Sequence, residues 1–295
     1  PPRSTLFPYT TLFRSVLGDD GWRRWVGPLR AAGRRVGVHV HLDTGLGREG
    51  VLAERVEEEL GGLAEVADVL EVRGVLTHFA NTEDVTEQAY AREQLRRFEV
   101  GVQGLQRVVG QRSLVRHAAA SAAALVLPES RLDRVRVGIS LYGLWPSRET
   151  RISSLIVAGA PRVLEPALAW RVGVQTMKWL SAGSYVGYGC TWRAVQDTRV
   201  AVLPVGYYDG YPRAASGRAW VLAGGRRCAV LGRVMMNHLI VDVTGAPVTE
   251  ESVVTLIGRD GDEEVTAEDL AGWAGTISYE IVARLGAHLP RRVVA

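Results

Sequence analysis

The order of secondary-structure patterns along the chain constrains the fold most strongly. From residue 16 to about residue 155, strand-like segments alternate with segments of helical hydrophobic spacing. The expected strands are 36–43, 70–79, 114–117 and 134–139, and the expected helices are 51–66 and 84–108. Repeated β-then-α units favour parallel strands covered by helices. The first part of the chain is therefore predicted to be α/β.

After about residue 157 the pattern changes to short segments rich in Val, Trp, Tyr and Thr, separated by Gly and Pro. Such segments predict a mainly β region, a small barrel or sandwich. They are 167–180, 198–207, 218–234, 238–244 and 252–258. A helix is expected over 266–274, with Thr266 as its N-cap. We expect two domains, 16–155 and 156–295.

A closed (β/α)8 barrel takes roughly 250 residues, whereas 16–155 shows four strand–helix units. The expected fold class is thus α/β plus all-β: a partial (β/α)8 TIM barrel followed by a C-terminal β-rich domain. Four units could also belong to an open sheet. Residues 1–15 nearly repeat themselves and lack acidic side chains, so we interpret them as a linker or adapter artefact; a natural disordered terminus is the alternative.

Composition excludes several classes of partner. The net charge is only +3, and basic residues do not cluster with aromatic ones, so no nucleic-acid partner is expected. No apolar run would span a bilayer and no secretory pattern is present, which predicts no membrane partner. The two cysteines, Cys190 and Cys228, form no disulfide framework and favour the cytoplasm. Lys178 is the only lysine among 35 basic residues.

Histidines mark the ends of the expected strands. His39 and His41 share one face of a strand with Asp43. Together with His78 and His117 they form one candidate for a metal site, as in amidohydrolase-type enzymes. The alternative is that these histidines form hydrogen bonds inside the barrel.

Two further groups lie at strand ends, where barrels present functional side chains. Arg48 closes the turn D-T-G-L-G-R and can clamp a carboxylate or phenolate oxygen, although a solvated turn arginine would look similar. His78, in T-H-F-A, can stack on a flat ring or simply cap its strand by a hydrogen bond.

A third group offers a phosphate cradle. Ser121 opens a predicted helix, where backbone N–H groups and a serine hydroxyl bind phosphate or form an ordinary N-cap. Gly138 and Ile139 would add their amides. Arg136 precedes them, and an arginine inside a barrel rarely stays unpaired. A pyridine nitrogen facing Arg136 would explain its position.

In the β-rich part, Tyr188 lies between two glycines and can donate or accept a proton, or be an ordinary strand tyrosine. Three more motifs accompany it: P-V-G-Y-Y-D-G-Y with Tyr207, G-R-V-M-M-N-H with Met236, and T-I-S-Y-E with Tyr279.

From about residue 38 to residue 292, the order and spacing of at least seven of these motifs resemble the alanine racemase family. The resemblance implies an isomerase that depends on pyridoxal 5'-phosphate (PLP), with an N-terminal (β/α)8 barrel and a C-terminal β-rich domain. It also implies a homodimer whose active site is shared between subunits.

The resemblance implies a role for each matching residue. Arg136 would hydrogen-bond the PLP pyridine nitrogen, with His78 beside the ring. The residues that would bind the phosphate are Ser121, Gly138, Ile139 and Tyr279. Arg48 would lie near the phenolate and the substrate carboxylate. Tyr188 would be the base acting on L-alanine from the partner subunit, with Tyr207 and Met236 in the substrate site.

The implied activity interconverts L- and D-alanine through a PLP aldimine with two bases, Tyr188 and a lysine in a V-K-A-x-A-Y-G segment, and supplies D-alanine for peptidoglycan. That segment does not occur in the 295 residues, so we expect an N-terminally truncated chain that is inactive as given. The alternatives are a metal-dependent TIM-barrel hydrolase using His39, His41, His78 and His117, or a non-catalytic fragment.

Three positions depart from the family pattern. His41 replaces a lysine that is often carbamylated, and an imidazole does not supply the negative charge of a carbamate to Arg48. Ala120 replaces an asparagine before the phosphate-binding serine. Asn237 replaces an aspartate after Met236.

Overall fold

The structure is a computed structural model that describes residues 14–16, 19–83 and 87–294. The described residues form two compact units. Unit 1 runs to Gly138 and includes Ser147–Arg162, and unit 2 contains Ile139–Pro146 and continues from Val163. Each unit is described by itself.

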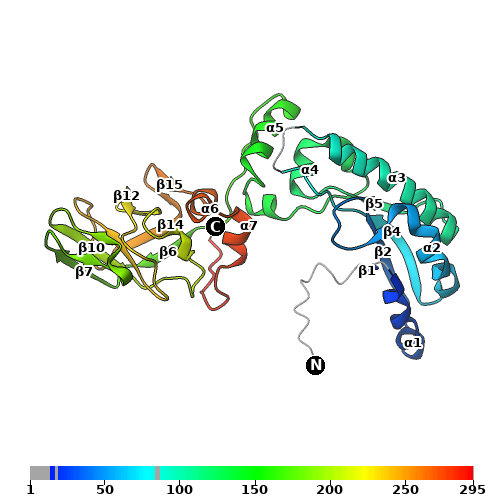
Figure 1. Ribbon diagram of the computed structural model, residues 1–295, viewed down its shortest axis with the longest axis horizontal. Helices are drawn as coiled ribbons and strands as arrows, with labels where there is room; N and C mark the ends of the chain where they lie inside the picture. The colour runs from blue at the N-terminus through cyan, green and yellow to red at the C-terminus, as the bar shows by residue number, and fades with distance from the viewer. Residues whose placement is uncertain (1–13, 17–18, 84–86, 295) are drawn as a thin grey trace. The chain divides into compact units, whose positions relative to one another are not determined.

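Unit 1 is built on a parallel sheet in the order β1-β2-β4-β5, with β3 paired to the end of β2 (Figure 1). The strands are β1 (Arg14–Val16), β2 (Val36–Asp43), β3 (Val51–Leu52), β4 (Leu70–Leu76) and β5 (Val115–His117). The apolar side chains of β2, at Val38, Val40 and Leu42, are fully buried. His39 and His41 on the opposite face are buried too, and a strand buried on both faces is typical of a parallel sheet covered by helices.

The helix α3 (Ala89–Val109) covers one face of this sheet. Its buried side chains Phe98, Val102 and Leu105 pack into the same core as the β2 valines, and Gly110 ends the helix in the left-handed conformation. The other helical segments of unit 1 are η2 (Asp19–Trp22), α1 (Arg23–Ala31), η3 (Ala53–Arg55), α2 (Val56–Leu60), η4 (Gly61–Val66), α4 (Ser121–Val126), η5 (Pro128–Ser130) and α5 (Arg148–Ala158).

Unit 2 consists mainly of antiparallel strands. One sheet has the order β13-β10-β7, and a second has the order β12-β11-β14-β15 with β6 paired to β14. The strands are β6 (Trp170–Gly173), β7 (Thr176–Leu180), β8 (Tyr185–Val186), β9 (Trp192–Arg193), β10 (Thr198–Leu203), β11 (Trp220–Ala223), β12 (Arg226–Ala229), β13 (Leu239–Asp242), β14 (Val253–Asp260) and β15 (Glu263–Val265). The short helices are η6 (Ile139–Tyr142), η7 (Tyr188–Cys190) and η8 (Arg213–Ala215).

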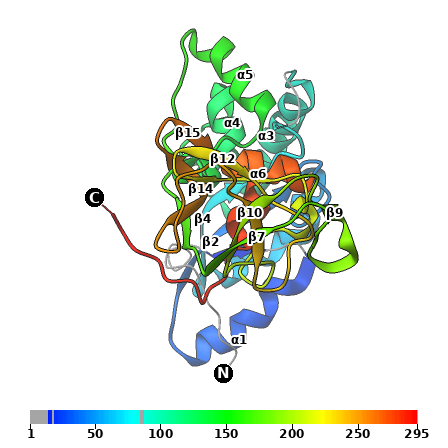
Figure 2. The ribbon, with the colours of Figure 1, turned by 90° about the vertical axis from the view of Figure 1, so that its left-hand side faces the viewer.

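The helices α6 (Ala267–Ala274) and α7 (Ser278–Ala283) complete unit 2, and both views show α6 beside the sheet of β14 (Figure 2). Leu270 packs into one core with Leu203 and Leu256, which belong to different sheets. Thr266 caps α6 as predicted, and its hydroxyl accepts a hydrogen bond from the Asp269 N–H while the Asp269 carboxylate accepts one from the Thr266 N–H.

The predicted fold class, an α/β part followed by a β-rich part, is confirmed, and the strand expected over 36–43 coincides with β2. Three local expectations were wrong. Residues 51–66 form β3, η3, α2 and η4 rather than one helix, and the strand over 70–79 ends at Leu76. Residues 134–138 form no strand: Arg136 N–H donates one backbone hydrogen bond to Ala119 O, and no ladder continues from it.

The domain limits also differ from the expected ones. The helix α5 crosses residue 155, so unit 1 extends to Arg162, while Ile139–Pro146 belongs to unit 2. Arg14 and Ser15, which we assigned to an adapter, lie in β1 opposite Val38 and His39. Residues 1–13 of that segment lie outside the described residues. No helix in the described part of the chain is long and apolar enough to cross a bilayer.

Candidate active site

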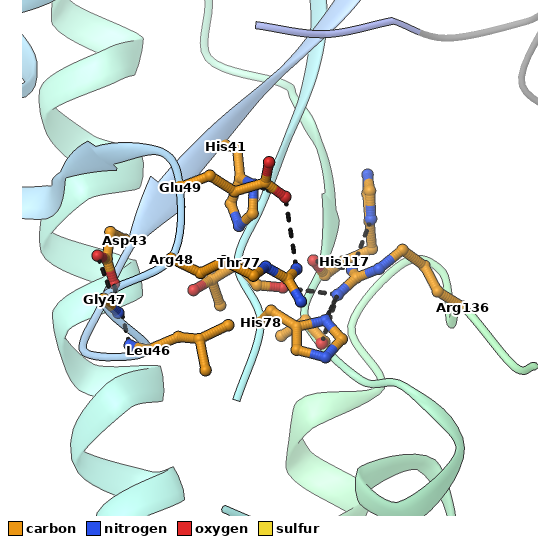
Figure 3. Close-up of polar contacts among 11 residues, drawn as sticks. His41, Asp43, Leu46, Gly47, Arg48, Glu49, Thr77, His78, His117 and Arg136 are labelled. Atoms are coloured by element: carbon orange, nitrogen blue, oxygen red, sulfur yellow. Dashed lines mark hydrogen bonds and ion pairs between the residues drawn. The ribbon is translucent and has the colours of Figure 1, made fainter. Parts of the chain in front are cut away.

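The loops that follow the carboxyl ends of β2, β4 and β5 lie at one edge of the parallel sheet in unit 1. This edge is the usual place for functional groups in an α/β protein. It brings together three side chains that the sequence singled out: Arg48, His78 and Arg136 (Figure 3). A fourth, Ser121, opens α4 after β5.

Asp43 organises the loop after β2. Its carboxylate accepts hydrogen bonds from the N–H groups of Gly45, Leu46 and Gly47 at 2.9–3.2 Å. Gly47 has a φ of +71°, which side-chain-bearing residues rarely adopt. The glycine and the aspartate together turn the chain tightly, so that Arg48 lines a pocket with His78 and Leu46.

A buried amide joins the loops after β2 and β4. Gln94, on α3, accepts a hydrogen bond from Ala80 N–H at 2.9 Å. Its Nε2 donates to Thr44 Oγ1 and to the carbonyl oxygen of His78, both at 3.3 Å. Thr44 Oγ1 also lies 2.7 Å from Thr77 Oγ1. The sequence analysis missed Gln94, because a glutamine in an amphipathic helix carries no distinctive signal.

The guanidinium of Arg136 is held by several acceptors. Its two terminal nitrogens donate to the carbonyl oxygens of Thr77, His117 and Ala118 at 2.7–3.1 Å. They also lie 2.9 Å from Nδ1 of His117 and 3.2 Å from Nδ1 of His78. Among the described residues, no acceptor takes the Nε hydrogen of Arg136. This group therefore has one donor left for a ligand.

The arginine also fixes the protonation of the histidines. A guanidinium only donates hydrogen bonds, so Nδ1 of both His78 and His117 must accept. Nε2 of His117 then carries a hydrogen and lies 2.6 Å from Nδ1 of His39. Gly74 of β4 separates these two rings, and a Cβ there would come within 2.6 Å of the His39 ring. A glycine at this position lets the contact pass over β4.

Burial and the neighbouring arginines keep these imidazoles neutral. Desolvation, followed by the charge of Arg136, lowers the pKa of His117 to about 3 and that of His78 to about 4. Desolvation and the charge of Arg134 lower the pKa of His39 to about 4. Desolvation and the charge of Arg48 lower the pKa of Arg136 to about 10, so the guanidinium remains protonated at neutral pH. The pocket is therefore cationic.

Ser121 and Gly138 meet although they are 17 residues apart. Ser121 is the first residue of α4, and its Oγ accepts a hydrogen bond from Gly138 N–H at 3.0 Å. A Cβ built at Gly138 would meet nothing within 4 Å. Ala120 precedes Ser121 and lines the pocket. Open space beside a hydroxyl and a helix start suits an anionic group.

Glu49 is a second residue that the sequence analysis missed. Its Oε1 lies 3.4 Å from Nη2 of Arg48 and 3.6 Å from Nδ1 of His41, which is buried at the end of β2 (Figure 3). Desolvation lowers the pKa of His41, and the charge of Glu49 opposes that shift. The signal was present in the sequence, because Glu49 directly follows Arg48.

The metal-site alternative receives no support from this geometry. In the described part of the chain, no group of three or more His, Cys, Asp or Glu side chains is arranged to hold a metal ion. The guanidinium of Arg136 instead occupies the space between His78 and His117, and its positive charge would repel a cation there.

Three of the other predicted residues lie near the segment 233–236 of unit 2. Tyr207 N–H donates to Met235 O at 3.0 Å, so its chain lies against that of Met236. A Cβ at Gly187, beside Tyr188, would lie 3.5 Å from Met235 Cε. The side chains of Tyr188, Tyr207 and Met236 are exposed, by 71%, 43% and 54% respectively.

Two members of the predicted phosphate-binding set also belong to unit 2. The side chain of Ile139 is buried in the core of that unit, and Tyr279 on α7 packs against the same core. Unit 1 thus holds Arg48, His78, Ser121, Arg136 and Gly138, whereas unit 2 holds Tyr188, Tyr207, Met236, Ile139 and Tyr279.

Two family models match the chain, and the N-terminal one includes Ile139, which packs with unit 2. The model of the alanine racemase N-terminal domain matches residues 17–146, and that of the alanine racemase C-terminal domain matches residues 167–293. An alanine racemase from Leptospira interrogans is 42% identical over 258 residues, which cover 87% of this chain and 66% of the relative. One from Symbiobacterium thermophilum is 44% identical over 268 residues, covering 89% and 68%. The chain spans about two thirds of the length of these relatives.

Solved structures show the same likeness. The alanine racemase of Streptomyces lavendulae aligns with a TM-score of 0.85 at 34% identity, covering 96% of this chain and 72% of the other. The alanine racemase of Bartonella henselae, which carries covalently bound PLP, aligns with a TM-score of 0.76 over 92% of this chain and 70% of the other. At 23% identity, that second alignment concerns the fold alone.

Proposed function

We propose that this chain, which belongs to the alanine racemase family, contributes the PLP pocket and the β-rich unit of an enzyme that interconverts L- and D-alanine. The observation that carries the proposal is the guanidinium of Arg136, which neutral histidines and backbone carbonyls hold in place with its Nε hydrogen unused by the described residues.

The residues present fit PLP. The unused Nε donor of Arg136 suits an unprotonated pyridine nitrogen. The Ser121 hydroxyl, with the open space at Gly138, suits a phosphate, and the positive charges of Arg48 and Arg136 suit an anionic cofactor. PLP, when bound, acts as an electron sink that makes the Cα–H of an attached amino acid acidic.

Arg136 would control how strongly PLP withdraws electrons from Cα of the amino acid. A guanidinium with a pKa of about 10 stays protonated at neutral pH and offers only donors, so it favours an unprotonated ring nitrogen. Arg48 would bind the carboxylate of the substrate or the phenolate oxygen. Both roles need side chains that are held in place. The hydrogen bonds from Arg136 to Thr77 O and His117 O hold the Arg136 side chain.

We further propose that Tyr188 exchanges a proton with Cα through its phenolic oxygen, with Tyr207 and Met236 shaping the substrate site. Their exposure on unit 2 suits a homodimer in which this surface completes the site of a second subunit. The enzyme would act in the cytoplasm and supply D-alanine for peptidoglycan. Racemisation needs a second base, and the only lysine of this chain, Lys178, lies exposed on β7 in unit 2. The chain alone would therefore bind PLP without racemising alanine.

A titration of the full chain with PLP, followed by absorbance and equilibrium dialysis, tests the proposal. We expect saturable binding that Arg136→Gln weakens at least about tenfold and that Arg112→Gln, at an exposed arginine elsewhere in unit 1, leaves unchanged. D-alanine should form from L-alanine only after a lysine-bearing N-terminal segment is added. Absence of binding would contradict the proposed pocket. So would PLP that borohydride reduction fixes covalently on Lys178.

A further inference from the structure

The backbone that follows Glu49 packs closely against the end of β2. The next residue, Gly50, has a φ of +109°, and a Cβ there would come within 2.9 Å of both Asp43 N and His41 O. After Gly50, β3 pairs with the end of β2 at Leu42 and Asp43. The backbone on the carboxyl side of Glu49 is thus pressed against β2, which limits where its carboxylate can reach.

The carboxylate of Glu49 contacts two different groups of the pocket. Its Oε1 lies 3.4 Å from Nη2 of Arg48 and 3.6 Å from Nδ1 of His41. Asp43 is the other carboxylate that acts on His41, but the loop amides already engage it. Among the described residues, Glu49 is the carboxylate that forms an ion pair with Arg48.

The charges of the pocket explain why such a contact matters. Arg48 acts electrostatically on both His78 and Arg136, so its guanidinium lies within a cationic group whose members repel one another. Arg48 is itself 57% exposed, and an exposed arginine without a fixed anion samples many rotamers. His41 is buried, and an imidazole is either neutral or cationic, so it offers Arg48 no charge of the opposite sign.

We propose that Glu49 is a positioning residue, whose carboxylate holds the guanidinium of Arg48 over the pocket and provides the negative charge that His41 lacks. The proposal deepens the proposed function and rests on it for the identity of the ligand, the substrate carboxylate or cofactor phenolate that Arg48 would clamp.

The first test measures the side chains of the full chain without any ligand. NMR of labelled protein gives the mobility of the Arg48 Nε–H group and the pKa of the His41 ring. Glu49→Gln should raise that mobility to the level of an unpaired surface arginine. It should also lower the pKa of His41, because the negative charge that opposes its downward shift is removed.

Two matched variants separate charge from orientation. Glu54→Gln removes the same charge at an exposed glutamate of η3 and should change neither signal. Glu49→Asp keeps the charge but shortens the side chain. The pKa of His41 should therefore stay close to that of the unsubstituted protein, while the mobility of the Arg48 Nε–H group rises. If Glu49→Gln leaves both the Arg48 mobility and the His41 pKa at their original values, the proposal is wrong.

PLP titration separates this proposal from the proposed function. We expect Glu49→Gln to weaken PLP binding by about three- to tenfold, the effect of losing one partly exposed positioning contact. If the chain binds no PLP but shows the expected NMR changes, the proposed function is wrong and the Glu49 contact is supported. If the Glu49→Gln variant binds PLP as tightly as the unsubstituted chain and its NMR signals are unchanged, only the Glu49 proposal is wrong.

Discussion

Nη1 of Arg136 lies 2.9 Å from Nδ1 of His117, and this contact sets the direction of hydrogen bonding across three strands. The guanidinium must donate, so the hydrogen of His117 is placed on Nε2, which faces Nδ1 of His39 at 2.6 Å. The whole chain of contacts requires neutral imidazoles. The stability of the fold should therefore depend on pH.

The first prediction concerns stability in mild acid. His39, His78 and His117 have folded-state pKa values of about 4, 4 and 3, below the 6.5 of an unfolded histidine. Between pH 6.5 and about 4 the unfolded chain binds protons that the native chain does not, so stability falls as pH falls. We expect a loss on the order of 2–5 kcal/mol between pH 7 and pH 5, measured by urea unfolding.

Substitution of His117 separates this effect from general acid sensitivity. His117→Asn can still accept a hydrogen bond from Arg136 but does not titrate, so its stability should fall less between pH 7 and pH 5. His238→Asn, at a half-buried histidine of unit 2, should keep the full loss. Equal slopes for the two variants would show that the histidines at Arg136 do not govern the acid response.

The second prediction concerns the buried amide of Gln94. Gln94→Ala leaves Ala80 N–H and His78 O without their partner inside the protein, which should cost about 2–4 kcal/mol of unfolding free energy. Gln106→Ala, on the same helix, removes an exposed contact to Arg112 O and should cost less than about 1 kcal/mol. Chemical denaturation compares the two. If both variants lose a similar unfolding free energy, the hydrogen bonds of Gln94 to Ala80 and His78 contribute little to stability.

The third prediction concerns the turn that carries Tyr207. Gly206 packs directly against the carbonyl oxygens of Met235 and Met236, so Gly206→Ala forces these segments apart. We expect destabilisation of unit 2 by about 2 kcal/mol or more. Gly272→Ala, inside α6 with free space around it, should be neutral or stabilising by up to about 1 kcal/mol. Thermal unfolding tests this, and a Gly206→Ala protein as stable as wild type would refute the close packing.

The fourth prediction concerns the capping box of α6. Thr266→Ala removes the hydroxyl that accepts the Asp269 N–H hydrogen bond, which should cost about 1 kcal/mol. Thr266→Ser keeps the oxygen and should recover most of that loss. Melting temperatures of the two variants give the comparison. If the serine variant melts as low as the alanine variant, the cap does not act through its oxygen.

Local rules in the sequence determined most of the elements. Segment 36–43 predicted β2 because its apolar side chains alternate with polar ones, which is the period of a strand. Thr266 marked the start of α6 because its hydroxyl accepts a hydrogen bond from a free N–H. The motif order likewise indicated the family, which the matched domain models support. Strand alternation failed at 134–138, because a strand also requires a partner with which to form a ladder.

Only the tertiary structure decided how the charged groups meet. The sequence placed His39, His117 and Arg136 on separate segments, and their contact depends on Gly74 leaving room between two rings. It also placed Glu49 beside Arg48 without showing that the backbone at Gly50 turns its carboxylate toward His41. Propensity and periodicity act over a few residues, whereas pKa values and hydrogen-bond direction depend on burial and on neighbours distant in the chain.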